Sequence, residues 1–191
     1  MRLLSLDTSF SFINLTLIED GKVVLHHYVD DGKKTLEHLP SLLKGLGIDP
    51  EHMDAFAVSL GVGYLTSLRI GITFMKTLAY LTQKPIVGYE NLYMMCHFLK
   101  REGEFCVALK VSNQIFCRRC KDGKIGEIEV LKSLPEGVKV VGLSFQGLGD
   151  VSLEFFPFSL YCGLWAYKRL AEGYGGDDLM LLEPIYLKPP V

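Results

Sequence analysis

The feature that most constrains this chain is a hairpin signal that occurs twice, each time inside a similar run of strand-like sequence. The tripeptide Asp-Gly-Lys occupies residues 20–22 and again residues 122–124, an offset of 102 positions. Asp-Gly between alternating apolar and polar residues predicts a two-residue β-hairpin turn. The strand-like run ending at Asp7 recurs at nearly the same offset in the run ending near Lys110. Two halves with the same three-stranded opening predict a duplicated α/β fold.

The remaining elements extend this prediction along both halves. In the first half we expect strands at residues 2–7, 12–18, 22–29, 55–60 and 85–89, and helices at 35–46, 66–81 and 90–101. The second half offers two paired strands, EFCVALKVS and NQIFCRRC, then weaker strands and one helix near 157–173. We therefore predict an N-terminal lobe at 1–102 and a smaller, degenerate C-terminal lobe at 103–191.

Composition restricts the classes of function. Apolar residues make up 49% of the 191 residues and charged residues 22%, which is enough to bury a core. The net charge of −2 excludes a basic field over the whole molecule that would hold a nucleic-acid backbone. No apolar run approaches the roughly 18 residues of a membrane span. The opening MRLLSLDTSF lacks the apolar core of a signal peptide, so we expect a cytoplasmic protein with no membrane association.

An odd number of cysteines, five, without a secretory signal predicts reduced thiols. Cys117 and Cys120 form a CxxC pair. The pair could be redox-active or half of a zinc site, but a zinc ribbon needs a second pair and a redox CxxC should open a helix. This CxxC lies in a predicted strand, which favours two ordinary strand residues.

Residues 7–9 and the segment 61–71 are the candidate nucleotide-facing positions. Asp7, Thr8 and Ser9 follow the first strand, where a carboxylate and two hydroxyls can face a metal-bound water or a phosphate; the alternative is a turn in which they bond their own backbone. Gly61 and Gly63 could let the backbone approach a phosphate at a helix N-terminus. No Walker lysine follows them, so the signal is weak.

The helix predicted at 66–81 has an unusually wide apolar arc. One flank carries Leu68, Ile72, Met75 and Ala79, and a second carries Ile70, Phe74 and Leu81, with Leu78 and Gly71 between the two flanks. A surface helix needs only one apolar stripe to pack on its sheet. The second flank therefore predicts either a protein partner or a helix buried entirely within this chain.

Signals for a complete catalytic site are missing. The five histidines are His26, His27, His38, His52 and His97, and none of them forms the i, i+4 pair of a helical metal site. The second-half strand matching the Asp7 strand carries Lys110, where a two-lobed phosphoryl-transfer site would need a carboxylate for Mg²⁺. No G-x-S-x-G nucleophile motif is present, which argues against a peptidase.

Three motifs resemble the TsaB (YeaZ) family. They are LLSLDTS at residues 3–9, GVGYLTSLRIG at 61–71, and Pro-x-Tyr-Leu-Lys at 184–188. The middle motif of the family reads GPGSFTGLRIG, and seven of its positions match in order here: Gly61, Gly63, Thr66, Leu68, Arg69, Ile70 and Gly71. This motif is the most specific of the three, and together they span nearly the whole chain.

The resemblance implies an actin-like, RNase H-like duplicated fold of the ASKHA type, and a non-catalytic scaffold that activates a TsaD-type threonylcarbamoyltransferase. It implies a larger complex with a TsaE-type ATPase, homodimers when alone, and indirect contact with tRNA. ATP and Mg²⁺ would act in the complex, with no cofactor held strongly by the isolated chain. A glycoprotease (M22) label would reflect homology only. The implied partner interface lies on two helices: Leu36, Leu39, Leu43, Arg69, Ile70, Phe74, Thr77, Leu78 and Leu81.

Departures from the family pattern bear mainly on a nucleotide site. Val62, Tyr64, Leu65 and Ser67 replace the usual Pro, Ser, Phe and Gly. His38 directly precedes Leu39-Pro40 instead of lying several residues earlier. Residues 110–112 replace the usual Asp-Ala-Arg. The competing hypothesis is an actin-like small-molecule kinase or ATPase with its site around Asp7.

Overall fold

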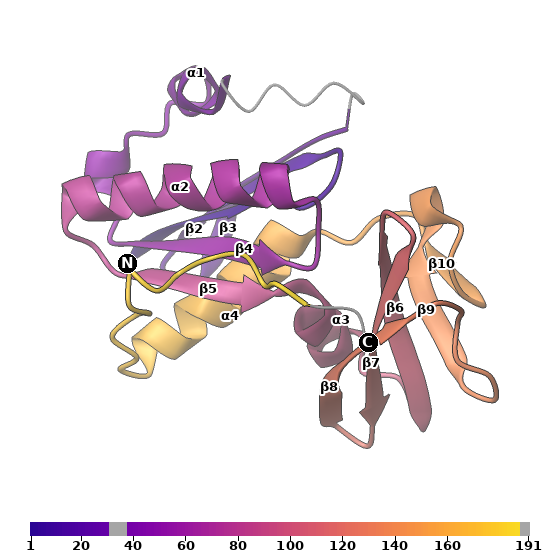
Figure 1. The fold of residues 1–191 in the computed structure, drawn as a ribbon. Coiled ribbons are helices and arrows are strands. Elements are labelled where there is room, and N and C mark those ends of the chain that lie inside the picture. The colour runs from indigo at the N-terminus through magenta and orange to yellow at the C-terminus, as the bar shows by residue number, and fades with distance from the viewer. Residues whose placement is uncertain (31–37, 188–191) are drawn as a thin grey trace. The chain divides into compact units, whose positions relative to one another are not determined.

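The computed structural model describes residues 1–30 and 38–187 (Figure 1). They form two compact units. The first contains residues 1–89 and 157–184, and the second contains residues 90–156 with the segment that begins at Ile185. Among the described residues, no helix is both long and apolar enough to cross a bilayer.

The first unit is built on a mixed sheet with the strand order β3-β2-β1-β4-β5. Its strands are β1 (Arg2–Asp7), β2 (Ile13–Glu19), β3 (Lys22–Val29), β4 (Ala55–Gly61) and β5 (Ile86–Glu90). The central strand β1 runs antiparallel to β2 and parallel to β4. It is buried from Leu3 onward, as expected for an apolar strand that is covered on both faces.

Three helices and a short 3-10 turn complete this unit. They are α1 (Leu39–Gly45), the 3-10 turn η2 (Pro50–His52), α2 (Leu65–Thr82) and α4 (Phe158–Ala171). The long helix α2 packs on β4 and β1, and α4 packs on β1, β2 and β4. Figure 1 shows these two helices on opposite faces of the first sheet. Of the helix predicted at 35–46, residues 35–37 lie outside the described residues, and Pro40 occupies the first turn as predicted.

The second sheet repeats the topology of the first. Its order is β10-β9-β6-β7-β8, with β6 (Glu104–Val111), β7 (Gln114–Lys121), β8 (Lys124–Leu131), β9 (Lys139–Leu143) and β10 (Val151–Leu153). The strand β6 is antiparallel to β7 and parallel to β9, as β1 is to β2 and β4. The helix α3 (Asn91–Leu99) packs on β6, β7 and β8. The predicted duplication is confirmed.

The two hairpins of the duplicated opening also share one turn geometry. Asp20 and Gly21 have φ values of 46° and 77°, and Asp122 and Gly123 have 49° and 77°. Two consecutive residues with positive φ form a type I′ turn, which suits Asp-Gly because glycine carries no penalty there. The repeated tripeptide therefore marks the same local structure in both units.

The second copy is degenerate where the first carries its longest helix. Between β4 and β5 the chain forms the 18-residue α2, but between β9 and β10 it forms only the 3-10 turn η3 (Ser144–Gln146). One apolar cluster beside the second sheet consists of Cys106, Ala108, Ile115, Cys117, Val140 and Leu148. The predicted degenerate second lobe is confirmed.

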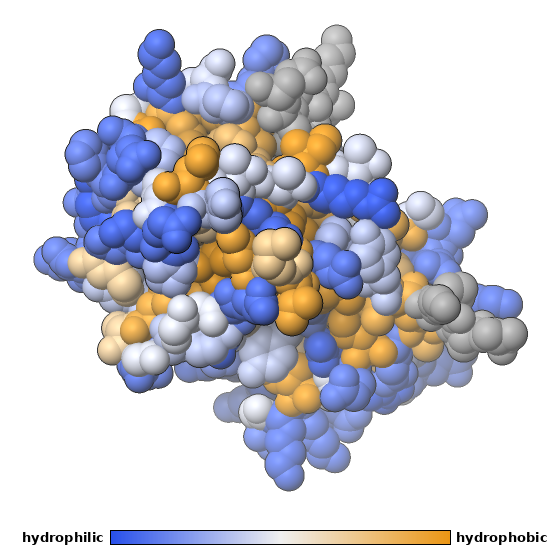
Figure 2. Space-filling model, turned by 60° about the vertical axis from the view of Figure 1, so that its left-hand side comes forward, coloured by the Kyte–Doolittle hydropathy of each residue, from blue (hydrophilic) through white to orange (hydrophobic). Residues whose placement is uncertain are grey.

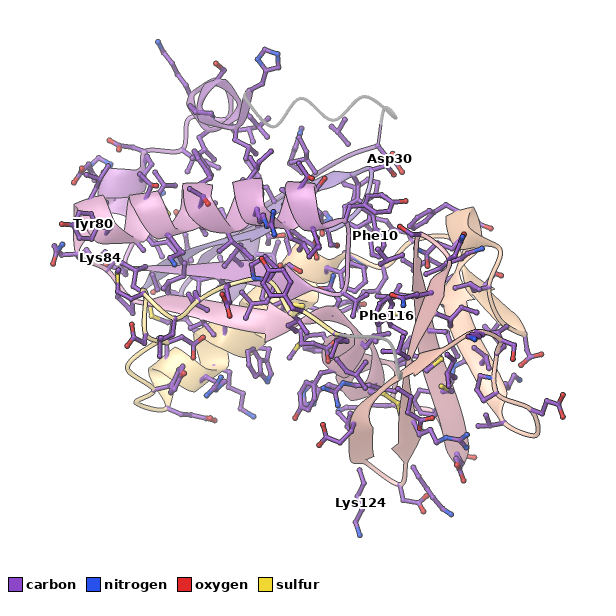
Figure 3. All side chains as sticks on the ribbon, viewed as in Figure 1. Phe10, Asp30, Tyr80, Lys84, Phe116 and Lys124 are labelled. Atoms are coloured by element: carbon purple, nitrogen blue, oxygen red, sulfur yellow. A yellow bond between two sulfur atoms is a disulfide. The ribbon has the colours of Figure 1, made fainter. Side chains whose placement is uncertain are left out.

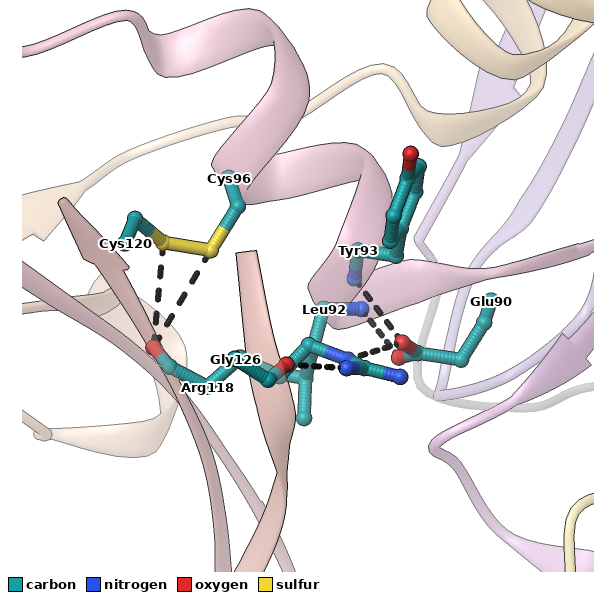
Figure 4. Close-up of polar contacts among 7 residues, drawn as sticks. All are labelled: Glu90, Leu92, Tyr93, Cys96, Arg118, Cys120 and Gly126. Atoms are coloured by element: carbon teal, nitrogen blue, oxygen red, sulfur yellow. Dashed lines mark hydrogen bonds and ion pairs between the residues drawn. A yellow bond between two sulfur atoms is a disulfide. The ribbon is translucent and has the colours of Figure 1, made fainter. Parts of the chain in front are cut away.

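The expectation of reduced thiols is wrong for two of the cysteines. Cys96 on α3 and Cys120 on β7 form a disulfide with a Cα–Cα distance of 5.9 Å (Figure 4). Cys117, the other member of the CxxC, is buried as a thiol beside Cys106. Cys117 packs beside Cys106, whereas Cys120 is bonded to Cys96. The CxxC spacing therefore does not predict the disulfide. The partner Cys96 is 24 residues away, on a helix whose position depends on the tertiary fold.

Candidate functional site

The two flanks of α2 have different environments. Leu68, Ile72, Met75 and Ala79 are all buried in the cluster formed with the first sheet. This is the flank expected to pack on the sheet, and its i, i+4, i+7, i+11 spacing places it along one line of the helix. The sheet-facing side of α2 is therefore as predicted.

The second flank of α2 lacks a full cover among the described residues of this chain. Ile70 is 41% exposed and Leu81 is 66% exposed, while Phe74 and Leu78 are half-buried. Tyr80, near the C-terminal end of the helix, is exposed as well (Figure 3). The described residues of this chain therefore do not bury α2 entirely, against the second of the two alternatives. Figure 2 shows one face of the molecule, on which patches of hydrophobic surface lie among hydrophilic residues.

A groove of about 540 Å³ lies between the second flank of α2 and the α1 region. Phe74 and Leu78 form its wall on α2. The opposite wall consists of Pro40, Leu43, Lys44, Gly47, Ile48, Asp49 and Pro50. With the exposed Ile70 and Leu81, this groove forms what we call the α1–α2 face. It is apolar at its centre and carries one charge of each sign, Lys44 and Asp49.

The predicted interface residues take different positions relative to this face. Arg69, Ile70, Thr77 and Leu81 are exposed on α2. Leu39 and Leu43 are buried in the core of the first unit, and Leu43 also lines the groove. Leu36 lies outside the described residues. Groove residues that the sequence analysis missed, notably Ile48 and Pro50, follow α1 in a loop without periodic signal.

The three residues after β1 form a hydrogen-bonded turn. Asp7, Thr8 and Ser9 are all buried. Asp7 Oδ1 accepts hydrogen bonds from the Ser9 main-chain nitrogen at 2.7 Å and from Ser9 Oγ at 2.6 Å. Thr8 Oγ1 donates to the main-chain oxygen of Ser67 at 2.8 Å. The side chains therefore make the contacts of the turn alternative, and they also tie β1 to the start of α2.

The glycines of the 61–71 motif permit this contact. A Cβ atom on Gly63 would lie 2.4 Å from the main-chain oxygen of Ser9, which accepts a hydrogen bond from the Tyr64 nitrogen at 2.7 Å. Gly61 has a φ of 115°, a region that other residues rarely adopt. In this structure the motif holds two loops together at the carboxyl ends of β1 and β4.

The buried phenol of Tyr89 and the half-buried phenol of Tyr28 lie near this loop. Tyr89 donates from its hydroxyl to the main-chain oxygen of Leu6 at 2.9 Å, and burial raises its pKa well above 10. Burial, assisted by the charges of Asp30 and Asp7, raises the pKa of Tyr28 to about 12. Both phenols therefore stay protonated at neutral pH and act as hydrogen-bond donors or packing groups.

In the second unit, the strand that corresponds to β1 ends differently. Lys110 is exposed, and its main chain is held by Gln146 through both an N–H···O and an N–H···O=C hydrogen bond of 2.9 Å. Within residues 1–30 and 38–187, no group of three or more His, Cys, Asp or Glu side chains is placed to share a metal ion.

Comparisons with known proteins agree on one group of relatives. A family model described as "TsaD: tRNA N6-adenosine threonylcarbamoyltransferase" matches residues 33–112. The TsaB protein of Escherichia coli is 31% identical over 98 residues, covering 50% of this chain and 42% of the relative. TsaB of Bacillus subtilis is 27% identical over 96 residues, covering 48% of this chain and 42% of the relative.

A threonylcarbamoyltransferase of Geotalea uraniireducens is 27% identical over 135 residues, covering 59% of this chain and 39% of the relative. The chain thus spans between 39% and 42% of the length of these three relatives. YeaZ from Pseudomonas aeruginosa has the same fold over 97% of this chain and 99% of its own, with a TM-score of 0.73 at 23% identity. In sequence this chain is therefore similar to proteins named TsaD and TsaB, and in fold it is similar to YeaZ.

Proposed function

We propose that the chain is a non-catalytic scaffold subunit in the biosynthesis of tRNA threonylcarbamoyladenosine. In this proposal it binds and activates a TsaD-type threonylcarbamoyltransferase through the α1–α2 face. The names of the matched relatives support the pathway. The observation that carries the docking site is the second flank of α2, where Ile70 and Leu81 expose apolar surface beside a groove.

The chemistry of the face supports a protein as its occupant. The lining of the groove is mostly aliphatic with one aromatic side chain, Phe74, and Lys44 and Asp49 lie on the wall opposite α2. Protein interfaces typically have an apolar centre and polar groups at the rim. A helix of the partner that packs along α2 would cover the second flank and fill the groove. A second copy of this chain would occupy the same face when the partner is absent.

The proposal assigns nucleotide chemistry to the complex. Asp7 Oδ1 is engaged by two hydrogen bonds within its own turn, and the corresponding strand end in the second unit presents Lys110. An acidic pair for Mg²⁺ is therefore not assembled from these two positions. We expect ATP and Mg²⁺ to act with the TsaD-type and TsaE-type subunits, and tRNA to be contacted indirectly.

Co-expression with the TsaD-type protein of the same source, followed by size-exclusion chromatography, tests this proposal. Ile70→Glu and Leu81→Glu place a charge in the α1–α2 face at exposed positions, so the fold should survive. We expect each variant to weaken the heterodimer at least tenfold, since burying an unpaired charge costs a few kcal/mol. Val24→Glu makes the same chemical change at an exposed position on β3 and should bind as wild type does.

Heterodimer formation by both α2 variants at wild-type affinity would place the partner elsewhere. Separate elution of the two wild-type proteins would remove the scaffold role. Calorimetry of the isolated chain with ATP and Mg²⁺ then distinguishes the alternative kinase or ATPase, which requires binding without a partner.

A further inference from the structure

A pocket of about 380 Å³ in the second unit opens onto the disulfide between Cys96 and Cys120. Both cysteines line the pocket, although each is almost fully buried otherwise. The remaining lining residues are His97, Lys100, Arg101, Phe105, Gly123, Lys124 and Ile125. A small molecule in the pocket would therefore lie against both disulfide-bonded residues.

The pocket is positively charged. Lys100, Arg101 and Lys124 bring three cationic groups to it, and among its described lining residues there is no aspartate or glutamate. Clustered charges of one sign at a concave site concentrate counter-ions and accelerate their association. Phe105 and Ile125 add apolar wall. These properties suit a small anionic ligand that also has a compact apolar or polarisable portion.

We propose that this pocket binds a small anionic thiol, of the carboxylate-bearing thiol peptide class, and that the bound thiol exchanges with the Cys96–Cys120 disulfide. In the first step the ligand thiolate attacks one protein sulfur. A mixed disulfide forms, the Cys96–Cys120 bond breaks, and the other cysteine leaves as a thiolate. In the second step another ligand thiolate attacks the mixed disulfide and releases the second cysteine.

The reaction is balanced without any further reagent. Two ligand thiols are oxidised to one ligand disulfide, and one protein disulfide is reduced to two thiols after each thiolate takes up a proton. The surrounding cations favour both steps, because they attract the anionic ligand and stabilise the leaving thiolate.

The structure also provides for the reduced state. The main-chain oxygen of Arg118 lies 4.0 Å from Cys96 Sγ and 3.8 Å from Cys120 Sγ (Figure 4). Once the disulfide is reduced, this oxygen can accept an S–H hydrogen bond from either thiol. Two buried thiols would then have a polar contact without rearrangement of β7.

Reduction changes how α3 is held on the second sheet. Its N-terminus is fixed by Glu90, whose carboxylate accepts from the nitrogens of Leu92 at 2.6 Å and Tyr93 at 2.9 Å and pairs with Arg118. Its C-terminal half is fixed covalently through Cys96. The exchange therefore releases one end of α3 and leaves the other end anchored.

The test compares two thiol probes on the oxidised protein. Reduced glutathione, which is anionic, and 2-mercaptoethanol, which is neutral, are applied at equal thiolate concentration. The reaction is stopped by alkylation, and mass spectrometry measures the reduced fraction of Cys96 and Cys120. We expect glutathione to react about tenfold faster, with an advantage that shrinks as salt is added.

Charge-matched variants assign this advantage to the pocket. Lys100→Gln combined with Lys124→Gln should remove most of the glutathione advantage. The rate with 2-mercaptoethanol should fall less than the rate with glutathione, because only the stabilisation of the thiolates is lost there. Lys132→Gln combined with Lys139→Gln removes two exposed charges from the same unit outside the pocket, and it should retain the advantage. Far-UV circular dichroism checks that every variant and the reduced protein keep the fold.

Equal rates for the two probes would overturn the proposal, as would an equal loss of the advantage in both double variants. Reduction only under conditions that unfold the second unit would overturn it too. A Cys96→Ser variant gives independent support: oxidised glutathione should form a mixed disulfide at Cys120, while the buried Cys106 and Cys117 stay unmodified. Equal modification of Cys106, Cys117 and Cys120 by glutathione would contradict a thiol-binding site beside Cys120.

Discussion

Thr8 Oγ1 lies so close to Gly71 that a Cβ atom built on Gly71 would come within 2.2 Å of it. The hydroxyl group is held there by its hydrogen bond to the Ser67 main-chain oxygen at 2.8 Å. It cannot turn away without losing that bond. The spacing between the loop after β1 and the helix α2 thus depends on the absence of a side chain at residue 71.

A Gly71→Ala substitution should therefore destabilise the protein, even though alanine favours helices. We expect the free energy of unfolding to fall by about 1–3 kcal/mol, the range for overpacking a tight contact. Gly45→Ala in α1 is the control, because nothing lies within 4 Å of its added Cβ; there we expect no loss, or a gain below about 1 kcal/mol. Urea denaturation measures both, and equal stability of the two variants would contradict the prediction.

Asp7→Ala should affect stability more than partner binding. Asp7 Oδ1 accepts two hydrogen bonds from Ser9, and the group is buried, so its removal should cost about 1–3 kcal/mol of the free energy of unfolding. The affinity for the TsaD-type partner should stay within twofold of wild type where the variant is folded. A folded Asp7→Ala protein that loses partner-dependent activity completely would instead indicate a nucleotide site at the loop.

His26 belongs to a polar network between β2, β3 and α4. Asn14 Oδ1 accepts from the Ser159 nitrogen at 2.9 Å, which leaves Asn14 Nδ2 to donate to His26 Nε2 at 3.3 Å. The His26 proton is then on Nδ1, which faces Thr16 Oγ1 at 2.8 Å. Protonation of Nε2 would remove the acceptor that Asn14 uses.

Burial, assisted by the nearby His27, lowers the pKa of His26 below 6.5. In the unfolded chain His26 has its ordinary pKa and therefore takes up a proton at a higher pH than in the folded protein. The stability contributed by neutral His26 is therefore fully present above pH 6.5. It is lost as the pH falls through the lower pKa of the folded state. His26→Gln keeps an acceptor for Asn14 without titrating. Urea denaturation between pH 8 and pH 5 should show a smaller decline for this variant; parallel curves would contradict the assignment.

The ion pair between Glu90 and Arg118 should matter far more than its exposed neighbours. Its side chains are 13% and 14% exposed, its Nε–Oε2 distance is 2.6 Å, and Glu90 also caps α3. Glu90→Ala leaves Arg118 without its carboxylate partner and should cost about 3–5 kcal/mol. Glu129→Ala breaks a pair with Arg119 whose side chains are 44% and 43% exposed, and should cost at most about 1 kcal/mol. Similar losses in both variants would show that burial does not govern these pairs.

Much of the fold could be predicted from local signals. The Asp-Gly turns and alternating strands specify the duplicated opening, and the spacing of Leu68, Ile72 and Met75 specifies the buried side of α2. The exposed second flank could be predicted only as one of two alternatives. Periodicity counts apolar positions, but it does not say whether another segment of the same chain covers them.

The features that escaped prediction depend on contacts between segments far apart in sequence. Cys96 and Cys120 come together because α3 packs on β7, and no spacing rule links the two residues. The groove needs Ile48 and Pro50 from an irregular loop to face Phe74 and Leu78. The role of Gly71 is likewise visible only once Thr8 lies against it.

The return of α4 to the first sheet has a consequence for synthesis on the ribosome. The five strands of that sheet lie within residues 2–90 and are made first, but the helix that covers the face of β1 and β2 opposite α2 is not complete until residue 171. The strands of the second unit, at residues 104–153, leave the ribosome before it. Domains usually fold in order of synthesis. In this chain the first sheet keeps one apolar face uncovered until α4 has been synthesised. We therefore expect a chaperone that binds the nascent chain to bind that face.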